Sequence, residues 1–303
     1  MKVAVIGAAG FVGTRVVADF AAHPKVTEIR AIDRVAMGTA VPKTREIVGD
    51  FGEAATRKVA VDGADAVVHL ASILGGAAEA NPGLARRVNI DATLDLMEHL
   101  KQTAPATRLV FASTIAVYAK PMPDPVTDAT PFGPTMLYGA QKLMIEVALS
   151  DYAARGWLDG VSLRPSGVMA REGTDAALKS AFMSRLFWAV ARGDDMVLPV
   201  AAESRTWLAS VTNVARNFVR ATLIPKVGPI TAMTLPALSL TFGELVAALH
   251  RRFPESPSRI AFAPDPETVG LFGEYPHLQT AAADALGFTR DHDADALVAQ
   301  SLT

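Results

Sequence analysis

Two side chains of one predicted helix could take a proton from an alcohol. Tyr138 and Lys142 are four positions apart, so on a helix they would lie on the same face, one turn from each other. A Tyr side chain ordinarily titrates at about pH 10, and a nearby positive charge favours its phenolate, which can act as a base near neutral pH. Of the four Tyr in the chain, only Tyr138 has Lys at the fourth following position. The spacing predicts a catalytic pair, although an ordinary surface pair would share it.

A glycine-rich turn near the N-terminus predicts dinucleotide binding. An apolar strand over Val3–Ile6 leads into Gly7, Gly10 and Gly13, and a helical pattern follows to about Ala22. The first glycine permits the tight turn, the second lets the backbone approach a pyrophosphate, and the third lets helix and strand pack closely. The N-terminus of the helix would supply amide donors and partial positive charge for the phosphates.

Acidic residues after the next two strands predict which dinucleotide binds. Asp33 follows an apolar strand over 28–32, about 20 residues beyond the glycines, where it can accept hydrogen bonds from an adenosine ribose. A carboxylate there repels a 2′-phosphate, which favours NAD over NADP. Arg34 follows it and leaves NADP open, because a guanidinium could pair with that phosphate or stack on adenine. Asp50 is predicted to reach the adenine amino group.

The order of the predicted elements indicates an α/β fold with a Rossmann-type doubly wound parallel sheet. Strands are predicted over 3–6, 28–32, 46–49, 64–70, 108–112 and 160–163, and helices over 82–102 and 136–155. Such sheets bind ligands at the carboxyl ends of their strands, and five candidate residues fall at those ends: Gly7, Asp33, Asp50, Ala71 and Thr114. His69, inside an apolar strand, is predicted to be a hydrogen-bonded core residue and not a catalyst.

Beyond Pro165 the alternation of strands and helices breaks. Helices are predicted over 175–192, 214–223, 241–253 and 281–286, and a short strand over 196–200. We therefore predict an NAD-binding domain over residues 1–165. Residues 166–303 are predicted to form mostly a small mixed substrate-binding cap, with some segments returning to the sheet.

Composition excludes several classes of function. Half of the 303 residues are hydrophobic and a fifth are charged, which is ordinary for a globular enzyme. The net charge of -2 offers no basic stripe for nucleic acid, and no apolar run is long enough to span a bilayer. The absence of Cys removes disulfides and thiolate chemistry and fits a cytoplasmic protein, and the six scattered His predict no metal site.

Together these residues resemble the extended short-chain dehydrogenase/reductase family over essentially the whole chain. The resemblance is carried by Gly7, Gly10, Gly13, Asp33, Asp50, Leu70, Ala71, Asn89, Ser113, Thr114, Tyr138, Lys142, Arg164 and Pro165. Two positions depart from the family pattern. Ala112 stands where Ser is common and Ala119 where Gly is usual, but neither departure removes a catalytic group.

The resemblance implies a role for each site residue. It implies a catalytic group of Thr114, Tyr138, Lys142 and Asn89. Contacts with NAD are implied for Gly7, Gly10, Phe11, Val12, Asp33, Asp50, Leu70, Ala71, Tyr138, Lys142 and Pro165. Contacts with substrate are implied for Ser72, Ser113, Thr114, Tyr138, Arg171 and Arg205. A homodimer is also implied, because the helix that carries the Tyr often pairs between subunits in this family.

Four looser stretches resemble one subgroup, the D-erythronate dehydrogenases, which oxidise a four-carbon sugar acid at its 2-hydroxyl. They are Asp124–Asp128, Arg205–Ser210, Leu235–Ala237 with Leu240–Thr241, and Asp265–Pro266. A small acid needs a bidentate partner for its carboxylate, and a guanidinium provides one. Arg205 is the first candidate and Arg171 the second.

Two other classes of function stay open. One is a nucleotide-sugar epimerase or dehydratase that uses bound NAD without net turnover. Dehydratases of this family place an Asp-Glu pair just after the catalytic Thr, where this chain has Ile115 and Ala116. The other is a cofactor-sensing protein without chemistry, and such relatives commonly lack the Tyr or the Lys. Release of NADH with substrate turnover would separate the dehydrogenase from the epimerase.

Overall fold

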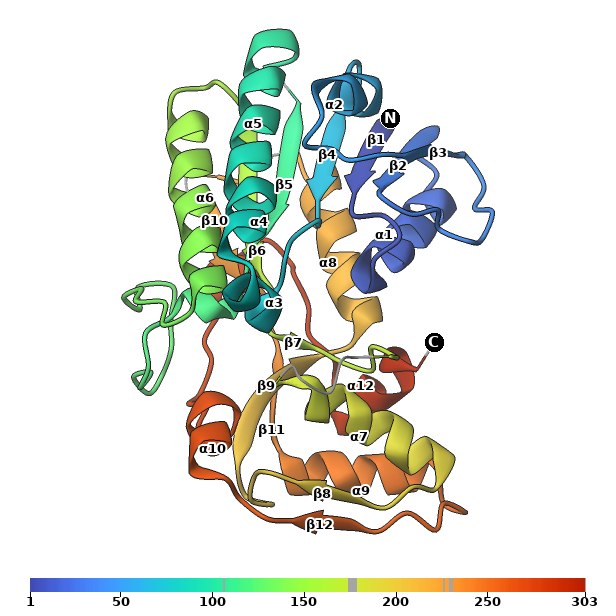
Figure 1. Ribbon diagram of the computed structural model, residues 1–303, viewed down its shortest axis with the longest axis vertical. Helices are drawn as coiled ribbons and strands as arrows, with labels where there is room; N and C mark the ends of the chain where they lie inside the picture. Colours follow the sequence, from blue (N-terminus) through green and yellow to red (C-terminus); the bar gives the residue numbers. More distant parts are fainter. Residues whose placement is uncertain (106, 174–178, 226, 229–230, 303) are drawn as a thin grey trace. The chain divides into compact units, whose positions relative to one another are not determined.

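The computed structural model describes residues 1–105, 107–173, 179–225, 227–228 and 231–302 of the chain (Figure 1). The chain divides into two compact units. Unit 1 consists of Met1–Tyr118, Phe132–Arg164 and Ala215–Thr234, and unit 2 of Ala119–Pro131, Pro165–Val214 and Leu235–Thr303. Unit 1 contains every predicted cofactor-binding and catalytic residue except Pro165.

Unit 1 is built on a seven-stranded sheet whose described neighbouring strands all run parallel. The order is β10-β6-β5-β4-β1-β2-β3. The strands are β1 (Lys2–Ile6), β2 (Glu28–Asp33), β3 (Thr44–Val48), β4 (Ala66–His69), β5 (Arg108–Ala112), β6 (Asp159–Arg164) and β10 (Ala232–Thr234). The order reverses between β1 and β4, which is the point where doubly wound sheets bind their ligands.

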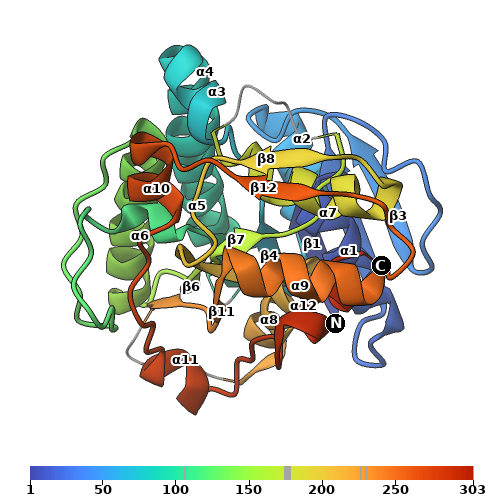
Figure 2. The same ribbon diagram turned by 90° about the horizontal axis from the view of Figure 1, so that it is seen from below.

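Helices cover both faces of this sheet (Figures 1 and 2). Helices α2 (Ala54–Val61), α5 (Ala92–Thr103) and α6 (Leu137–Ala154) pack on one face through a continuous apolar cluster. Helix α1 (Phe11–Ala22) and the unit 1 part of α8 (Val211–Leu223) lie on the other. The shorter helices are α3 (Gly75–Ala80), α4 (Pro82–Arg86) and the 3-10 turn η2 (Ile115–Val117). The predicted parallel α/β sheet is confirmed.

The helix predicted over 82–102 is not continuous. A π-helical turn, η1 (Arg87–Asp91), separates α4 from α5 and contains Asn89. A π turn inserts one residue into the helix and rotates the side chains that follow. The spacing of apolar residues did not reveal it, because both flanking helices keep a buried face.

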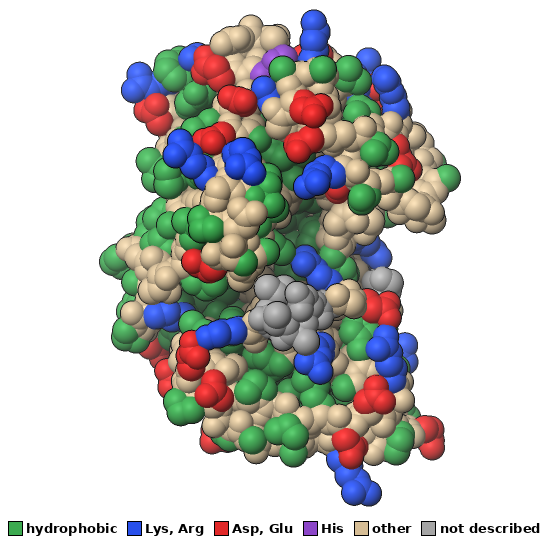
Figure 3. Space-filling view, in the orientation of Figure 1, with side chains coloured by type: hydrophobic (Ala, Val, Ile, Leu, Met, Phe, Trp, Pro, Cys, Tyr) green, Lys and Arg blue, Asp and Glu red, His purple; other side chains and the backbone are tan. Residues whose placement is uncertain are grey.

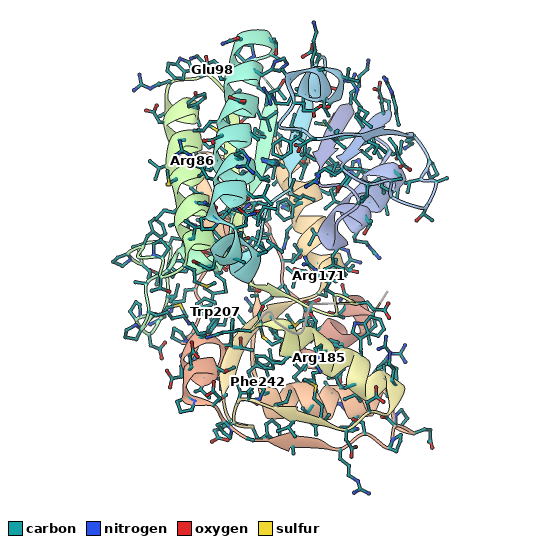
Figure 4. All side chains as sticks on the ribbon, viewed as in Figure 1. Arg86, Glu98, Arg171, Arg185, Trp207 and Phe242 are labelled. Atoms are coloured by element: carbon teal, nitrogen blue, oxygen red, sulfur yellow. The ribbon has the colours of Figure 1, made fainter. Side chains whose placement is uncertain are left out.

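Unit 2 is mixed, as predicted. Strands β7 (Gly167–Val168), β9 (Arg205–Ala209) and β11 (Leu238–Thr241) form one sheet, in which β9 pairs parallel with β7 and antiparallel with β11. Strands β8 (Met196–Leu198) and β12 (Ile260–Phe262) form a second, parallel pair. Its helices are α7 (Ala181–Arg192), α9 (Phe242–Arg252), α10 (Pro266–Phe272), α11 (Ala281–Ala285) and α12 (Ala294–Ser301). Trp207 and Phe242, labelled in Figure 4, are fully buried in it.

Several predicted boundaries beyond Pro165 need correction. Helix α7 begins at Ala181, and residues 175–178 of the helix predicted over 175–192 lie outside the described residues. Helix α8 begins at Val211 instead of 214. Strand β10 adds a seventh strand to the sheet of unit 1 that the sequence pattern did not reveal, because it has only three residues.

The described helices and the face shown in Figure 3 give no sign of a membrane span or of a large region of one charge on that face. No described helix has the length and apolar character needed to cross a bilayer. On the face in Figure 3, basic and acidic side chains are intermixed.

Candidate active site

In the turn after β1, backbone segments pack so closely that two of its glycines have no room for a Cβ. Gly7 has φ +88°, and a Cβ there would lie 2.7 Å from the amide nitrogen of Ala71. A Cβ on Gly13 would lie 2.0 Å from the carbonyl oxygen of Gly7. A Cβ on Gly10 would meet only that carbonyl oxygen, at 3.2 Å, so the other side of this residue is open. Helix α1 then begins at Phe11 without a side-chain cap.

These features fit a bound dinucleotide. The open side of Gly10 gives room for a pyrophosphate against the backbone, and the uncapped N-terminus of α1 offers partial positive charge. Leu70 and Ala71 flank the same turn, since both donate backbone hydrogen bonds to the carbonyl of Ile6.

The carboxylate of Asp33 is fixed beside the glycine turn. Its oxygens accept hydrogen bonds from the amide of Ala9 at 3.0 Å and of Arg34 at 2.7 Å. Each oxygen keeps a further lone pair with which it can bind a ribose hydroxyl. The Arg34 side chain is exposed. Asp50 follows β3 and accepts a hydrogen bond from the amide of Gly52 at 2.8 Å, which holds its own turn together.

Asn89 connects three segments of the site. Its Oδ1 accepts hydrogen bonds from Ser72 Oγ at 3.0 Å and from the Ile73 amide at 2.8 Å. Its Nδ2 donates to the Ile73 carbonyl at 3.0 Å and to Gln141 Oε1 at 2.7 Å. All four hydrogen-bonding positions of the amide are therefore used within the protein. The geometry gives Asn89 a positioning role between the loop after β4 and α6.

Two residues with hydroxyl side chains, Ser113 and Thr114, directly follow β5. Thr114 caps the turn η2, because its Oγ1 accepts a hydrogen bond from the Ala116 amide at 3.1 Å. With that acceptor position used, its proton is directed elsewhere and can be donated to another oxygen. The buried Oγ of Ser113 has no hydrogen-bond partner among the described residues.

Helix α6 presents Tyr138 and Lys142 on one face. The Nζ of Lys142 lies 5.7 Å from the centroid of the Tyr138 ring and donates a hydrogen bond to the carbonyl of Ala112 at 2.7 Å. The helix approaches η2 so closely that a Cβ on Gly139 would lie 2.2 Å from the carbonyl oxygen of Ala116. This contact places the first turn of α6 directly beside the turn capped by Thr114.

Burial changes the electrostatics of this pair. Removal from water lowers the pKa of Lys142 to about 7, and the charge of Glu146 opposes that change.

His69 lies in β4 and contacts Phe51 and Phe111 through its ring. Its Nε2 is 3.0 Å from Thr93 Oγ1, as expected of a core His, but its Nδ1 has no partner among the described residues. Burial, and then the charge of Lys142, lower the pKa of His69 to about 3, so this ring is neutral.

A buried ion pair lies one turn beyond Lys142. Arg164, the last residue of β6, contacts both carboxylate oxygens of Glu146, with nitrogen–oxygen distances from 2.6 to 3.1 Å. The two side chains are 4% and 2% exposed. The guanidinium carbon of Arg164 also lies 4.6 Å from the centroid of the Phe132 ring.

Three predicted site residues belong to unit 2. Pro165 follows β6 directly, and Arg171, labelled in Figure 4, follows Ala170, whose φ is +66°. Arg205 begins β9, where its backbone forms a bridge with Glu274. The half-buried guanidinium of Arg205 makes no hydrogen bond or ion pair with the described side chains.

Sequence analysis missed three residues of unit 1 that shape the site. They are Gly139, Gln141 and Glu146. All three lie on the helix of Tyr138, and Glu146 is two turns from it on the same face, which is a signal the spacing offered. Gln141 and Gly139 could not be recognised, because their partners Asn89 and Ala116 are distant in sequence.

The structure offers little for a metal ion. Among the described residues, no three His, Asp or Glu side chains gather closely enough to hold one.

Comparison with known proteins places this site in a family. Residues 3–229 match the model of the NAD dependent epimerase/dehydratase family. A D-erythronate dehydrogenase from Cupriavidus necator is 31% identical over 98% of this chain and 97% of its own. Another, from Haemophilus influenzae, is 31% identical over 78% of this chain and 76% of its own.

A solved structure has the same fold over nearly the whole chain. It is described as the nucleoside-diphosphate-sugar epimerase from Agrobacterium tumefaciens, and it matches with a TM-score of 0.86 and 29% identity. The match covers 98% of this chain and 92% of the other. With the Tyr138–Lys142 pair and the glycine turn, these likenesses establish an NAD-dependent oxidoreductase. The chain belongs to the NAD dependent epimerase/dehydratase family, which is the extended kind of short-chain dehydrogenase/reductase.

Proposed function

We propose that the protein is an NAD-dependent dehydrogenase that oxidises a hydroxyl of a small sugar acid, D-erythronate-like, at the 2-position. The observation that carries the proposal is the buried Lys142 beside Tyr138, with Thr114 at the adjacent strand end. The two D-erythronate dehydrogenases that are 31% identical support the substrate class.

Each site residue of unit 1 has a defined part in the proposed reaction. The Thr114 hydroxyl donates a hydrogen bond to the oxygen of the substrate alcohol, and the Tyr138 phenolate takes the proton of that alcohol. The ammonium of Lys142 favours the phenolate and binds the nicotinamide ribose. NAD, when bound, supplies the acceptor for the hydride that leaves the substrate carbon. Asn89 and Gln141 hold α6 and the loop after β4 in register.

We propose that Arg205 binds the carboxylate of the substrate, with Arg171 as the second candidate. A small acid has little apolar area, so its charge must orient it, and a guanidinium can bind both oxygens at once. The guanidinium of Arg205 in unit 2, which makes no ion pair with a described residue, suits this role. Ser72 and Ser113 add hydrogen bonds to the substrate.

We also propose that the enzyme is cytoplasmic, where a reaction that consumes NAD has its cofactor.

The direct test is a substrate panel. Four- to six-carbon aldonates and uronates are incubated with the enzyme and NAD, and the absorbance of NADH is followed. The proposal expects sustained NADH formation with a four-carbon 2-hydroxy acid and little with the polyol of equal length. Absence of NADH formation across the panel would reject it.

A second candidate is a nucleotide-sugar epimerase with bound NAD. The solved structure named for this activity supports it, at 29% identity over nearly the whole chain. An epimerase returns the hydride to the sugar, so it would interconvert two nucleotide sugars without releasing NADH. Product analysis with UDP-sugars separates the two functions.

A further inference from the structure

The helix of Tyr138 carries a third ionisable side chain in the same row. Tyr138, Lys142 and Glu146 occupy positions i, i+4 and i+8 of α6, so they lie along one face of the helix. Lys142 and Glu146 are both buried, so water does not stabilise the charge of either side chain. Burying an ammonium favours its neutral form unless an opposite charge lies nearby.

We propose that Glu146, fixed by Arg164, is the counter-charge that keeps Lys142 in its ammonium form, and so acts as a positioning residue for the Tyr138–Lys142 pair. The inference rests on the function proposed for that pair. Three hydrogen bonds from Arg164, which together engage both oxygens, hold the carboxylate in one place, and bidentate pairs of this kind are geometrically specific.

Among the described groups around Lys142, Glu146 is the only carboxylate, and Tyr138 bears negative charge only as the phenolate that Lys142 itself favours. From β4, His69 is neutral, because burial lowers its pKa to about 3. From β5, the contacts are the Phe111 ring and the Ala112 carbonyl, which do not titrate. From α6 itself, Tyr138 and Glu146 face it, and from β6 the charge at the same end of the strand is Arg164, which repels it, whereas Asp159 lies at the opposite end and is paired with Arg108.

The arrangement predicts that substituting Glu146 and substituting Arg164 will shift the protonation of Lys142 in opposite directions. Glu146→Gln leaves Arg164 as an uncompensated cation, which disfavours a second cation at Lys142. Arg164→Met leaves the carboxylate of Glu146 without its paired guanidinium and still close to Lys142, which favours the ammonium. If the pair served only to hold α6 on the sheet, both substitutions would weaken the fold and neither would move the titration of Lys142 in a set direction.

The experiment follows the titration of Lys142 directly. The protein is labelled with ¹³C at lysine Cε, the Lys142 resonance is assigned with Lys142→Arg, and its shift is recorded against pH without substrate. The midpoint is expected to fall by about one pH unit or more in Glu146→Gln and to rise in Arg164→Met. Glu146→Asp, which keeps the charge, should restore most of the wild-type midpoint.

Asp159→Asn is the matched control, because it removes a carboxylate from the Arg108–Asp159 pair at the opposite end of β5 and β6. This variant should leave the Lys142 midpoint unchanged. In the kcat/KM profile, Glu146→Gln should lose about tenfold at pH values above both midpoints and little below them.

An unchanged midpoint in Glu146→Gln, or a shift of the same sign in both variants, would overturn the inference. If Glu146→Gln fails to fold, Arg164→Met and Glu146→Asp still test it. Because the titration uses no substrate, it can fail while the sugar-acid reaction stands, and the substrate panel can fail while the titration succeeds.

Discussion

At the scale of the residue, burial of the Lys142 ammonium destabilises the folded protein, and we propose that its function requires this burial. Its pKa in the folded protein is about 7, against an ordinary value of 10.5, because it is buried. Between these two values the unfolded chain binds more protons, so the destabilisation is complete below about pH 7 and is relieved as pH rises toward 10.5. Lys142→Met should therefore be more stable than the wild type at pH 6, by about 1–3 kcal/mol, and this advantage should shrink by pH 9.

Chemical denaturation at both pH values measures this difference, and turnover should fall at least about a hundredfold in the same variant. A Lys142→Met protein that is less stable than the wild type by the same amount at pH 6 and pH 9 would contradict the assignment of the cost to the buried ammonium.

We propose that Asp33, also a single side chain, sets the preference of the enzyme for NAD over NADP. Its carboxylate is held by two backbone amides at the end of β2, where it would repel a 2′-phosphate. Asp33→Ala should narrow the preference for NAD over NADP in kcat/KM, with the exposed Arg34 then free to meet the phosphate. Steady-state kinetics with both cofactors check this, with Asp50→Ala as a control that should not change the ratio. A wild-type preference for NADP would show that Arg34 dominates.

The residues at strand ends were predictable because their chemistry is local. Gly7, Asp33 and Thr114 each follow a recognisable apolar strand, so their placement depends only on the strand before them. The unpaired Nδ1 of His69 was not predictable, because it depends on which side chains of β5 and the loop after β3 surround that ring.

At the scale of the element, the close approach of α6 to η2 fixes the position of Tyr138 in the first turn of that helix. A Cβ on Gly139 would overlap the Ala116 carbonyl oxygen at 2.2 Å, and backbone cannot move aside cheaply. Gly139→Ala should shift the start of α6, lower stability by about 1–3 kcal/mol and reduce kcat/KM about a hundredfold.

Gly270→Ala is the comparison for that variant. Gly270 also lies in a helix, α10, and a Cβ there would meet nothing within 4 Å. It should leave activity unchanged and alter stability by less than about 1 kcal/mol. Thermal melts and kinetics of the two variants should therefore diverge, and equal behaviour would refute the close-contact argument.

The π-helical turn marks the limit of prediction for elements. Apolar spacing predicted a helix over 82–102, and most of those residues are helical. The extra residue at η1 has its reason in tertiary structure, since it directs Asn89 to Ser72, Ile73 and Gln141. A single sequence does not show that two distant segments, the loop after β4 and α6, require one amide between them.

At the scale of the whole molecule, the outer face of α6 predicts self-association. Met144 and Val147 are 57% and 64% exposed, on the side of the helix opposite the buried Lys142 (Figure 3 shows hydrophobic side chains over this helix). We propose a homodimer through this face. Val147→Glu should give a monomer in sedimentation velocity, whereas Val197→Glu, on an exposed position of β8, should not. A wild-type monomer at micromolar concentration would contradict the proposal.

The parallel sheet of unit 1 was predictable over six of its strands, because alternating strands and helices leave few topologies. The seventh strand was not, and in unit 2 the strands β7, β9, β11 and β12 were not, although β8 and the helices α7, α9 and α11 were. Strand β10 reaches the sheet only after the chain has left unit 1 and returned, and the short strands β7 and β12 are fixed by their neighbours and not by their own pattern. The two units are interleaved in sequence, so the predicted boundary at Pro165 describes only part of their organisation.

The most direct test of the central claim is the rate of NADH formation by Tyr138→Phe with the best sugar acid of the panel. This change removes only the phenolic oxygen and keeps the ring beside Lys142. The account predicts that NAD binding, measured by calorimetry, stays within about threefold of the wild type, while kcat falls by at least about a hundredfold. Near-normal turnover in Tyr138→Phe would contradict the account, because another group would then have to take the proton.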